Sequence, residues 1–173
     1  RGVTCFEQMG IGGMAHLVNF QGTDTVPGLK AAYDYYDADL STLGFSVPAS
    51  EHAVMTSLGA DGELAIIEQI LDEFPTGIVS VVGDSYDIVN FVKNIVGTQL
   101  HDRIMSRDGK FVVRPDSPTE EWPMAADQMV WIYQTLWYAF GGTESPTGFK
   151  ILDDHVGVLW GDGIDRGGVH HIL

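Results

Sequence analysis

The chain has 173 residues, 45% of them hydrophobic and 19% charged, a composition typical of a folded globular domain that excludes intrinsic disorder. Its 24 acidic and 9 basic side chains give a formal net charge of -15, which would repel a polyanion, so we expect no nucleic-acid partner. No apolar stretch reaches the roughly 20 residues of a membrane span and the start shows no signal-peptide pattern, so we expect a cytoplasmic protein with no membrane partner.

The first third of the chain predicts one strand and two helices. An apolar run at about residues 17–20 predicts a strand. Residues 25–36 predict a helix with Thr25 as its N-cap. Residues 45–52 read as a short extended piece that leads into a helix starting near Ser50.

The middle of the chain alternates between helix and strand. Residues 62–74 have apolar side chains at helical spacing, and Pro75 ends that pattern. The β-branched run at residues 78–82 predicts a buried strand. Residues 86–97 return to helical periodicity, which Gly97 is expected to end.

The last part of the chain continues the alternation. An amphipathic stretch over residues 99–107 leads through an expected turn at Asp108–Gly109 into a strand at residues 110–116. Residues 120–140 are aromatic-rich and helix-like, and we interpret them as a packing helix. Residues 156–163 form the last expected strand.

Four of the apolar runs end in an aspartate, at Asp24, Asp84, Asp116 and Asp162. The carboxyl ends of buried parallel strands meet at one edge of a sheet, where α/β folds build their active sites, so we expect the four carboxylates to line one cleft. A single aspartate after a strand is often only the N-cap of the next helix. Four of them, with neighbouring glycines and Arg114, favour a site for a phosphorylated, polyhydroxylated ligand.

The pattern predicts an α/β fold with mainly parallel strands that form part of a (β/α) barrel. A complete barrel takes about 250 residues, and only four strands are secure here. The start at Arg1 without an initiator Met and the end soon after Asp162 are expected of a fragment. No linker or repeat predicts an internal boundary, so residues 1–173 are expected to be one domain, a segment of a larger barrel domain.

Six motifs resemble those of the nicotinamide phosphoribosyltransferases, in the same order and at similar spacing: RGV, HLVNFQGTDTVPGL, FSVPASEH, SVVGDSYDIVN, RPDS and GDGID. The resemblance implies that the pyridine nitrogen of nicotinamide displaces pyrophosphate from phosphoribosyl pyrophosphate, which gives nicotinamide mononucleotide for NAD salvage. It also implies the irregular barrel of type II phosphoribosyltransferases, the use of Mg²⁺, ATP as a coupled substrate, and a homodimer with sites at the subunit interface.

For the base, the resemblance implies that Asp24 accepts a hydrogen bond from the carboxamide of nicotinamide, with Arg1, Ser46 and Ser80 lining the same pocket. A carboxylate accepts from an amide but repels the carboxylate of nicotinate, so Asp24 would select amide over acid. The alternatives are that Asp24 caps the following helix, that Arg1 is only solvated, and that the two hydroxyls are partners of the local backbone.

For catalysis, the resemblance implies that His52 is phosphorylated while ATP hydrolysis is coupled to synthesis, and that Asp84 orients its imidazole. A neutral imidazole is a competent nucleophile, and a carboxylate beside it fixes the tautomer and stabilises the cation. The alternative is that His52 is a surface residue near a helix start.

For the sugar and phosphates, the resemblance points to Arg114 and Asp116 of RPDS and to Gly161 and Asp162 of GDG, with Asp116 counted among the catalytic residues. Arg offers a planar fork to phosphate oxygens, aspartates accept from ribose hydroxyls, and glycine permits close approach. Gly-Asp-Gly also makes ordinary turns, which is the alternative for that motif.

Two positions depart from the family pattern: Gly83 stands where many relatives carry a small polar residue, and Pro118 follows RPDS where glycine is usual. Because few basic residues are present to hold pyrophosphate, we expect the isolated chain to be inactive. Two other functions are weighed: a nicotinate phosphoribosyltransferase, which Asp24 disfavours, and a non-catalytic barrel remnant that acts as an interaction module.

Overall fold

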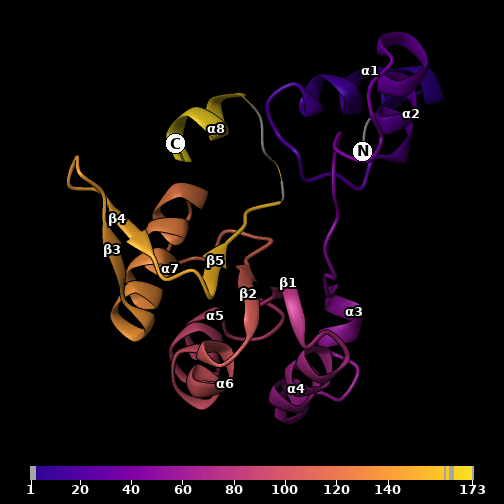
Figure 1. Cartoon of the computed structure of the whole chain (residues 1–173). Helices are drawn as coiled ribbons and strands as arrows, with labels where there is room; N and C mark the ends of the chain where they lie inside the picture. The colour runs from indigo at the N-terminus through magenta and orange to yellow at the C-terminus, as the bar shows by residue number, and fades with distance from the viewer. Residues whose placement is uncertain (1–2, 162, 164–165, 173) are drawn as a thin grey trace. The chain divides into compact units, whose positions relative to one another are not determined.

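The computed structural model describes residues 3–161, 163 and 166–172 (Figure 1). The chain divides into two compact units, Arg1–Val47 and Pro48–Leu173. Within the described residues, no helix is long and apolar enough to cross a membrane. The expectation that both units belong to one larger barrel domain stays a prediction.

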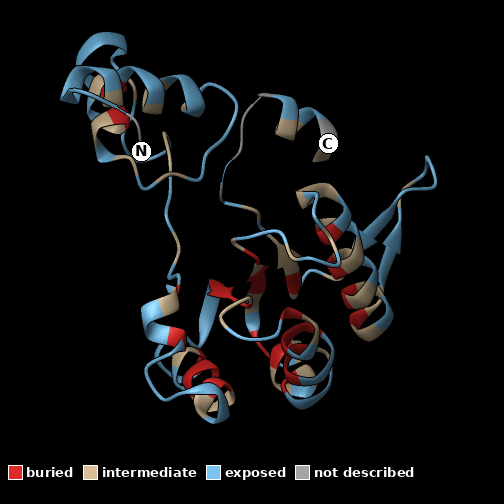
Figure 2. Ribbon diagram, turned by 180° about the vertical axis from the view of Figure 1, so that it is seen from behind, coloured by how far each residue is buried: buried red, intermediate tan, exposed pale blue. Residues whose placement is uncertain are grey.

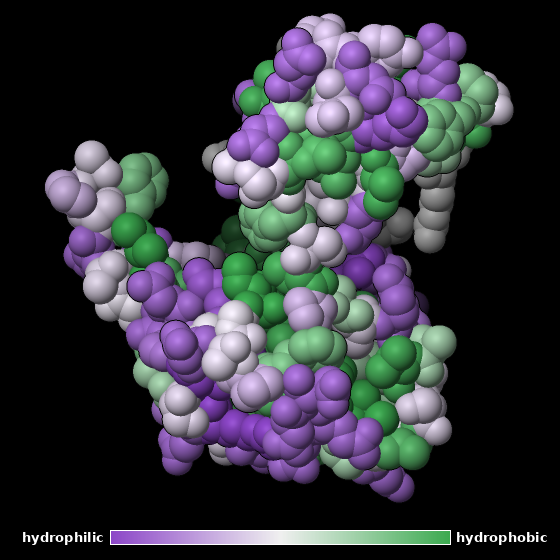
Figure 3. Space-filling model, turned by 45° about the vertical axis from the view of Figure 1, so that its right-hand side comes forward, coloured by the Kyte–Doolittle hydropathy of each residue, from purple (hydrophilic) through white to green (hydrophobic). Residues whose placement is uncertain are grey.

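The first unit is a pair of helices, α1 (Phe6–Leu17) and α2 (Val26–Tyr36), which pack through glycines. A Cβ added to Gly28 would lie 2.7 Å from the carbonyl carbon of Gly13, so only glycine allows the backbones to approach this closely. Few residues of this unit are buried. Several large hydrophobic side chains of this unit stay exposed, among them Phe6, Ile11, Val18 and Tyr35. Figure 3 shows hydrophobic patches among polar groups on the surface of the chain.

The strand predicted at residues 17–20 is wrong. Leu17 ends α1, and the backbone N–H groups of Val18, Asn19 and Phe20 donate back to carbonyls of the last helical turn. Residues 18–20 thus form the turn that closes α1 and do not pair with a neighbouring strand. Extended pairing begins only at Gly22, which forms an isolated parallel bridge with Phe45.

The second unit contains a parallel sheet of three strands in the order β1–β2–β5. These strands are β1 (Thr76–Val82), β2 (Asp108–Arg114) and β5 (Val156–Val158). They confirm three of the predicted strands. The described residues form an open α/β sheet, and the barrel stays a prediction.

The segment before the first helix of this unit adds a short parallel pairing at the free edge of β1. Ala49 forms a bridge with Ser80, because Ser80 N–H donates to the Pro48 carbonyl and Ser50 N–H donates to the Ser80 carbonyl. The extended piece predicted at residues 45–52 is therefore confirmed.

Helices connect the strands, and a small antiparallel hairpin precedes β5. Two details of the prediction are wrong: the helix does not end at Gly97, and Asp108–Gly109 is not a turn but the start of β2, paired with Thr76 and Gly77. The remaining elements are α3 (His52–Met55), the 3₁₀ helix η1 (Ala60–Gly62), α4 (Glu63–Glu73), α5 (Ile88–Asn90), the π-helix η2 (Phe91–Gln99), α6 (His101–Met105), α7 (Ala125–Phe140), β3 (Gly142–Glu144), β4 (Lys150–Leu152) and α8 (Arg166–Ile172).

The hydrophobic core of the second unit lies between its sheet and helices (Figure 2). The central strand residues Val79, Val81, Phe111 and Val113 are fully buried. The predicted packing helix is confirmed as α7, which contacts η2 and β5. This core fixes the carboxyl ends of β1 and β2, on which the candidate site is built.

Candidate active site

Asp84 joins the ends of two strands. It follows β1, only 7% of its side-chain surface is exposed, and both its oxygens have partners. Its Oδ2 accepts from the backbone N–H groups of Asp116 and Ser117, each at 2.8 Å, in the loop that follows β2. The predicted convergence is therefore found for Asp84 and Asp116.

His52 completes this arrangement from a third segment. It is the first residue of α3, and its Nε2 lies 3.1 Å from Asp84 Oδ1. Because a carboxylate only accepts, Nε2 carries the hydrogen, and Nδ1 keeps the lone pair of the neutral ring. The His52 side chain is 45% exposed, so a ligand can reach it. The structure thus brings together the two residues that were expected to pair.

Arg114 lies beside this pair at the end of β2. Its guanidinium is 3.2 Å from Asp116 Oδ1 and 3.5 Å from Glu51 Oε1. Its Nε is buried and has no hydrogen-bond partner within the described part of the chain. A Cβ added to Gly161 would lie 3.2 Å from this Nε, so the GDG and RPDS motifs meet here. A guanidinium that lies between carboxylates is suited to donate hydrogen bonds to an anionic oxygen.

Gly83 lies where the fold leaves no room for a side chain. A Cβ at this position would lie 2.6 Å from Cδ1 of Phe91, whose ring is fully buried in η2. The Gly83 N–H donates to the Arg114 carbonyl at 3.1 Å. Phe91 therefore takes the space that a side chain would need, and the backbone before Asp84 stays close to β2.

Ser80 lies in the middle of β1 with 3% exposure. Its hydroxyl has no hydrogen-bond partner among the residues that the structure describes. The alternative that this hydroxyl serves the local backbone thus has no support among the described residues, and the proposed contact of Ser80 with the base stays a prediction.

The first unit brings Asp24 and Ser46 together. The Ser46 hydroxyl donates to Asp24 Oδ1 at 2.5 Å, and both residues are exposed. Thr25 is the N-cap of α2, as predicted, but its side chain makes no capping hydrogen bond. The Asp24 carboxylate thus bonds a hydroxyl 22 residues away in the sequence, which weakens its interpretation as a helix cap.

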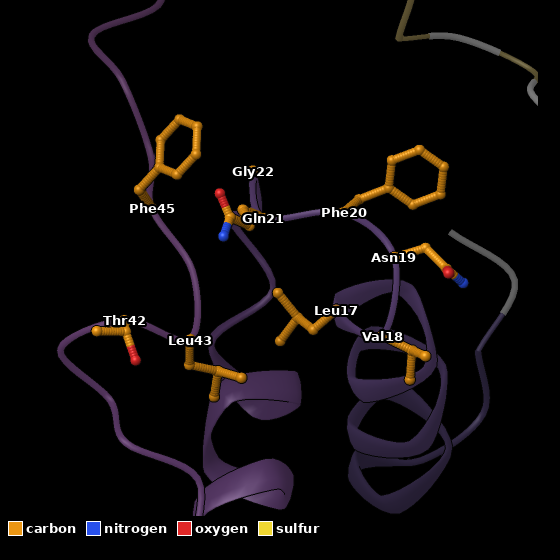
Figure 4. A pocket seen from close by; sticks show the side chains of 9 residues that line it. All are labelled: Leu17, Val18, Asn19, Phe20, Gln21, Gly22, Thr42, Leu43 and Phe45. Carbon is orange, nitrogen blue, oxygen red and sulfur yellow. The ribbon is translucent and has the colours of Figure 1, made fainter.

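A pocket of about 640 Å³ lies in the same unit, between the end of α1 and the segment before Val47. Figure 4 shows the aromatic rings of Phe20 and Phe45 and the amide of Gln21 around it. Its other lining residues are Leu17, Val18, Asn19, Gly22, Thr42 and Leu43.

Arg1 and Asp162 lie outside the described residues. His52, Asp84, Arg114 and Asp116 form one bonded cluster. The sequence does not single out three residues that contact this cluster or the strand beside it: Ser50, Glu51 and Ser117. Ser117 contributes a backbone N–H, which every residue except proline has, so no side-chain signal could identify it. Glu51 was detectable as the residue next to His52 in SVPASEH.

No group of three metal-ligating side chains is found among the described residues. A preformed protein cage for a cation therefore has no support in that part of the chain. Mg²⁺ commonly binds through one or two carboxylates together with substrate phosphates. Asp116, whose side chain is 22% exposed, is a carboxylate that could take part in this second mode.

Comparison with protein families matches residues 1–173 to the nicotinate phosphoribosyltransferase (NAPRTase) family. The chain belongs to this family. Its membership confirms the resemblance drawn from the six motifs.

Several relatives are named nicotinamide phosphoribosyltransferase, among them the following three. The protein from Xanthomonas campestris pv. campestris is 38% identical over all of this chain and 36% of its own length. The protein from Mycoplasma pneumoniae is 35% identical over 92% of this chain and 34% of its own length. The protein from Acinetobacter baylyi is 34% identical over 95% of this chain and 35% of its own length. The chain thus spans about a third of the curated relatives it matches.

For this family member, the described site falls into two groups. Two residues expected at the sugar and phosphates, Arg114 and Asp116, form a bonded cluster with Asp84 and His52 in the second unit. The pair expected at the base, Asp24 and Ser46, is bonded in the first. The roles of these residues stay predictions.

Proposed function

We propose that this chain contributes to a nicotinamide phosphoribosyltransferase, which transfers phosphoribosyl from phosphoribosyl pyrophosphate to nicotinamide. The observation that carries the proposal is the double use of Asp84. One of its oxygens bonds His52, and the other bonds the loop that contains Asp116. A single carboxylate thus connects the residue proposed to be phosphorylated with the residues proposed to hold the sugar.

In the transfer, the pyridine nitrogen attacks C1 of the sugar while the bond from C1 to the pyrophosphate oxygen breaks. Pyrophosphate leaves with the electron pair. Arg114, whose side chain is 20% exposed, is proposed to donate from its terminal guanidinium nitrogens to a phosphate oxygen, and Asp116 to accept from the ribose hydroxyls. Asp24 is proposed to accept from the carboxamide of the base, while the Ser46 hydroxyl holds the carboxylate in place.

Coupling to ATP is proposed to proceed through Nδ1 of His52. Asp84 accepts from the Nε2–H, which leaves Nδ1 as the nucleophile toward the γ-phosphorus. The bond from that phosphorus to the bridging oxygen breaks, and ADP leaves with the electron pair. The phosphorylated ring keeps its Nε2 hydrogen, so Asp84 can stabilise the resulting positive charge.

Mg²⁺ is proposed to enter with the phosphates of the substrates, where it neutralises charge that 9 basic residues cannot match. Asp116 is the carboxylate proposed to share it. A cytoplasmic location and a homodimer with shared sites belong to the same proposal.

Nicotinate is the alternative base, since the family description names it. The Asp24 carboxylate disfavours it, because two carboxylates would face each other. A non-catalytic role is the other alternative, and the bonded cluster of His52, Asp84, Asp116 and Arg114 argues against it, since a remnant has no need to keep these pairs.

Incubation of the intact protein with γ-labelled ATP tests the proposal. We expect an acid-labile phosphate on His52, together with nicotinamide mononucleotide once nicotinamide and phosphoribosyl pyrophosphate are added. Asp116→Asn should lower product formation by about 10- to 100-fold, the equivalent of one charge-assisted contact.

The matched control is His101→Gln. His101 also pairs with an aspartate, since its Nδ1 lies 2.8 Å from Asp102 Oδ1, but it lies in α6, outside the cluster. Its substitution should leave label and product unchanged. Label that persists in His52→Gln, or synthesis that survives loss of Asp116, contradicts the assignment.

A further inference from the structure

Ser50 has a buried hydroxyl next to the candidate site. Its exposure is 4%, and its Oγ accepts a hydrogen bond of 3.0 Å from the backbone N–H of Val82. Val82 is the last residue of β1 and is fully buried. This contact joins the segment that carries His52 to the strand that carries Asp84.

The contact replaces one step of a parallel ladder. Ser80 bonds to Pro48 and Ser50 through backbone groups alone. In a regular parallel pairing, the next N–H on this edge of β1, that of Val82, would bond to the Ser50 carbonyl. The chain instead turns away into α3, and the Ser50 side chain supplies the acceptor.

We propose that Ser50 is a positioning residue that holds His52 against Asp84. Its hydroxyl satisfies the last N–H of β1 and so allows the chain to leave the sheet before the pairing is complete. His52 follows Ser50 by two residues. This places it next to the end of β1, where Asp84 follows the strand, and its Nε2 lies within hydrogen-bond distance of the Asp84 carboxylate. The catalytic meaning of this role rests on the function proposed for His52.

The chemistry required of residue 50 is narrow. Alanine offers no acceptor, so the buried Val82 N–H would lose its partner, or the segment would shift to bring its carbonyl into reach. Either change alters the position of His52. Threonine keeps the oxygen and adds one methyl group, so it tests whether the acceptor is what matters.

The remaining contacts of the segment do not fix His52 by themselves. Glu51 is the N-cap of α3 and makes no side-chain capping bond. The α3 helix has only four residues, and a helix this short is not stable alone. Ser50 fastens this segment to β1 twice, through its N–H to the Ser80 carbonyl and through its hydroxyl to the Val82 N–H. Only the second bond depends on the side chain, and it lies nearer to the end of β1 that leads to Asp84. The Glu51–Arg114 ion pair joins the segment to the end of β2 at 3.5 Å, a weaker contact of an exposed carboxylate.

The experiment compares Ser50→Ala and Ser50→Thr in the intact protein. Hydrogen exchange of the peptide that contains Val82 reports the bond itself. The ¹⁵N chemical shifts of the His52 imidazole report its hydrogen bond to Asp84. The rate of phosphate labelling from ATP reports function. Ile104→Val serves as a matched control, since Ile104 is fully buried in α6 and its shortening destabilises the core without touching this segment.

We expect Ser50→Ala to speed exchange at Val82 by roughly 10- to 100-fold, to move the His52 Nε2 resonance away from its hydrogen-bonded position, and to slow labelling. Ser50→Thr should restore all three toward the wild type, and Ile104→Val should leave the imidazole shifts unchanged.

Faster exchange at Val82 with unchanged imidazole shifts would show that Ser50 is only structural and would overturn the proposal. Unchanged exchange would overturn it as well. If the wild type takes no label from ATP, the proposed coupling fails, while the exchange and imidazole measurements still decide the role of Ser50.

Discussion

Replacing Gly83 with alanine places a methyl group against the ring of Phe91. The added Cβ would lie 2.6, 2.7 and 3.1 Å from three ring carbons, well inside ordinary contact. The ring is fully buried and cannot swing into solvent. Overpacking of this kind costs about 1–3 kcal/mol, and because Gly83 directly precedes Asp84, the strain should also weaken the bond from Asp84 to His52.

A double-mutant cycle with Phe91→Leu isolates this clash. Shortening the ring should by itself destabilise the protein by opening a cavity, at about 24 cal/mol per Å³ of space left. In the double variant the methyl group fills part of that space. The double variant should therefore lose less free energy of unfolding than the two single variants together, with a coupling energy of about 0.5–3 kcal/mol. Equilibrium denaturation measures each free energy of unfolding, and ATP-dependent labelling of His52 follows the site. Full additivity, or a Gly83→Ala variant as stable as the wild type, would refute the steric explanation.

Three further substitutions test the scaffold by equilibrium denaturation. Burial, and to a smaller extent the nearby Asp87 carboxylate, raises the pKa of Glu63 above its ordinary value of 4.5. The stability that protonated Glu63 contributes is therefore complete below pH 4.5 and is lost as the pH rises through the raised pKa. Glu63→Gln should become more stable than the wild type as the pH rises above 4.5, and identical pH profiles of stability for the two proteins would contradict this. Arg107 donates to the carbonyls of Phe74 and Gly77, so Arg107→Ala should cost about 1–3 kcal/mol by removing both of these hydrogen bonds. Gly109→Ala should cost at least as much, because its Cβ would meet the Gly77 carbonyl oxygen at 2.0 Å; Gly157→Ala, whose nearest contact would be an ordinary 3.4 Å, is its control.

The strands of the second unit could be predicted because their β-branched runs fit a buried parallel sheet and little else. Residues 78–82 and 110–114 both lie in strands. The run at residues 17–20 is also mostly apolar, but it has only one β-branched residue and ends a helix that packs on α2 through Gly13 and Gly28. Periodicity over four residues does not contain that information.

The candidate site was predictable where a side chain carries the chemistry. His52, Asp84, Arg114 and Asp116 were all named from motifs, and they lie in one bonded cluster. The role of Ser50 could not be predicted, because it depends on which residue of β1 lies opposite Ser50 when the chain leaves the sheet. The amino-acid sequence alone does not specify that pairing register.

Competition between the two bases tests the central claim most directly. The intact protein is given equal concentrations of nicotinamide and nicotinate with limiting phosphoribosyl pyrophosphate, Mg²⁺ and ATP, and the product ratio reports the ratio of kcat/KM values. Asp24→Asn is compared with Asp39→Asn, which removes another exposed carboxylate that also accepts from a serine hydroxyl in the same unit.

We predict that nicotinamide mononucleotide dominates in the wild type and in Asp39→Asn. In Asp24→Asn the ratio should fall by about 10- to 100-fold, the equivalent of a charge-assisted hydrogen bond of about 1.5–3 kcal/mol. A wild type that forms mainly nicotinate mononucleotide, or a ratio that Asp24→Asn leaves unchanged, would contradict the account.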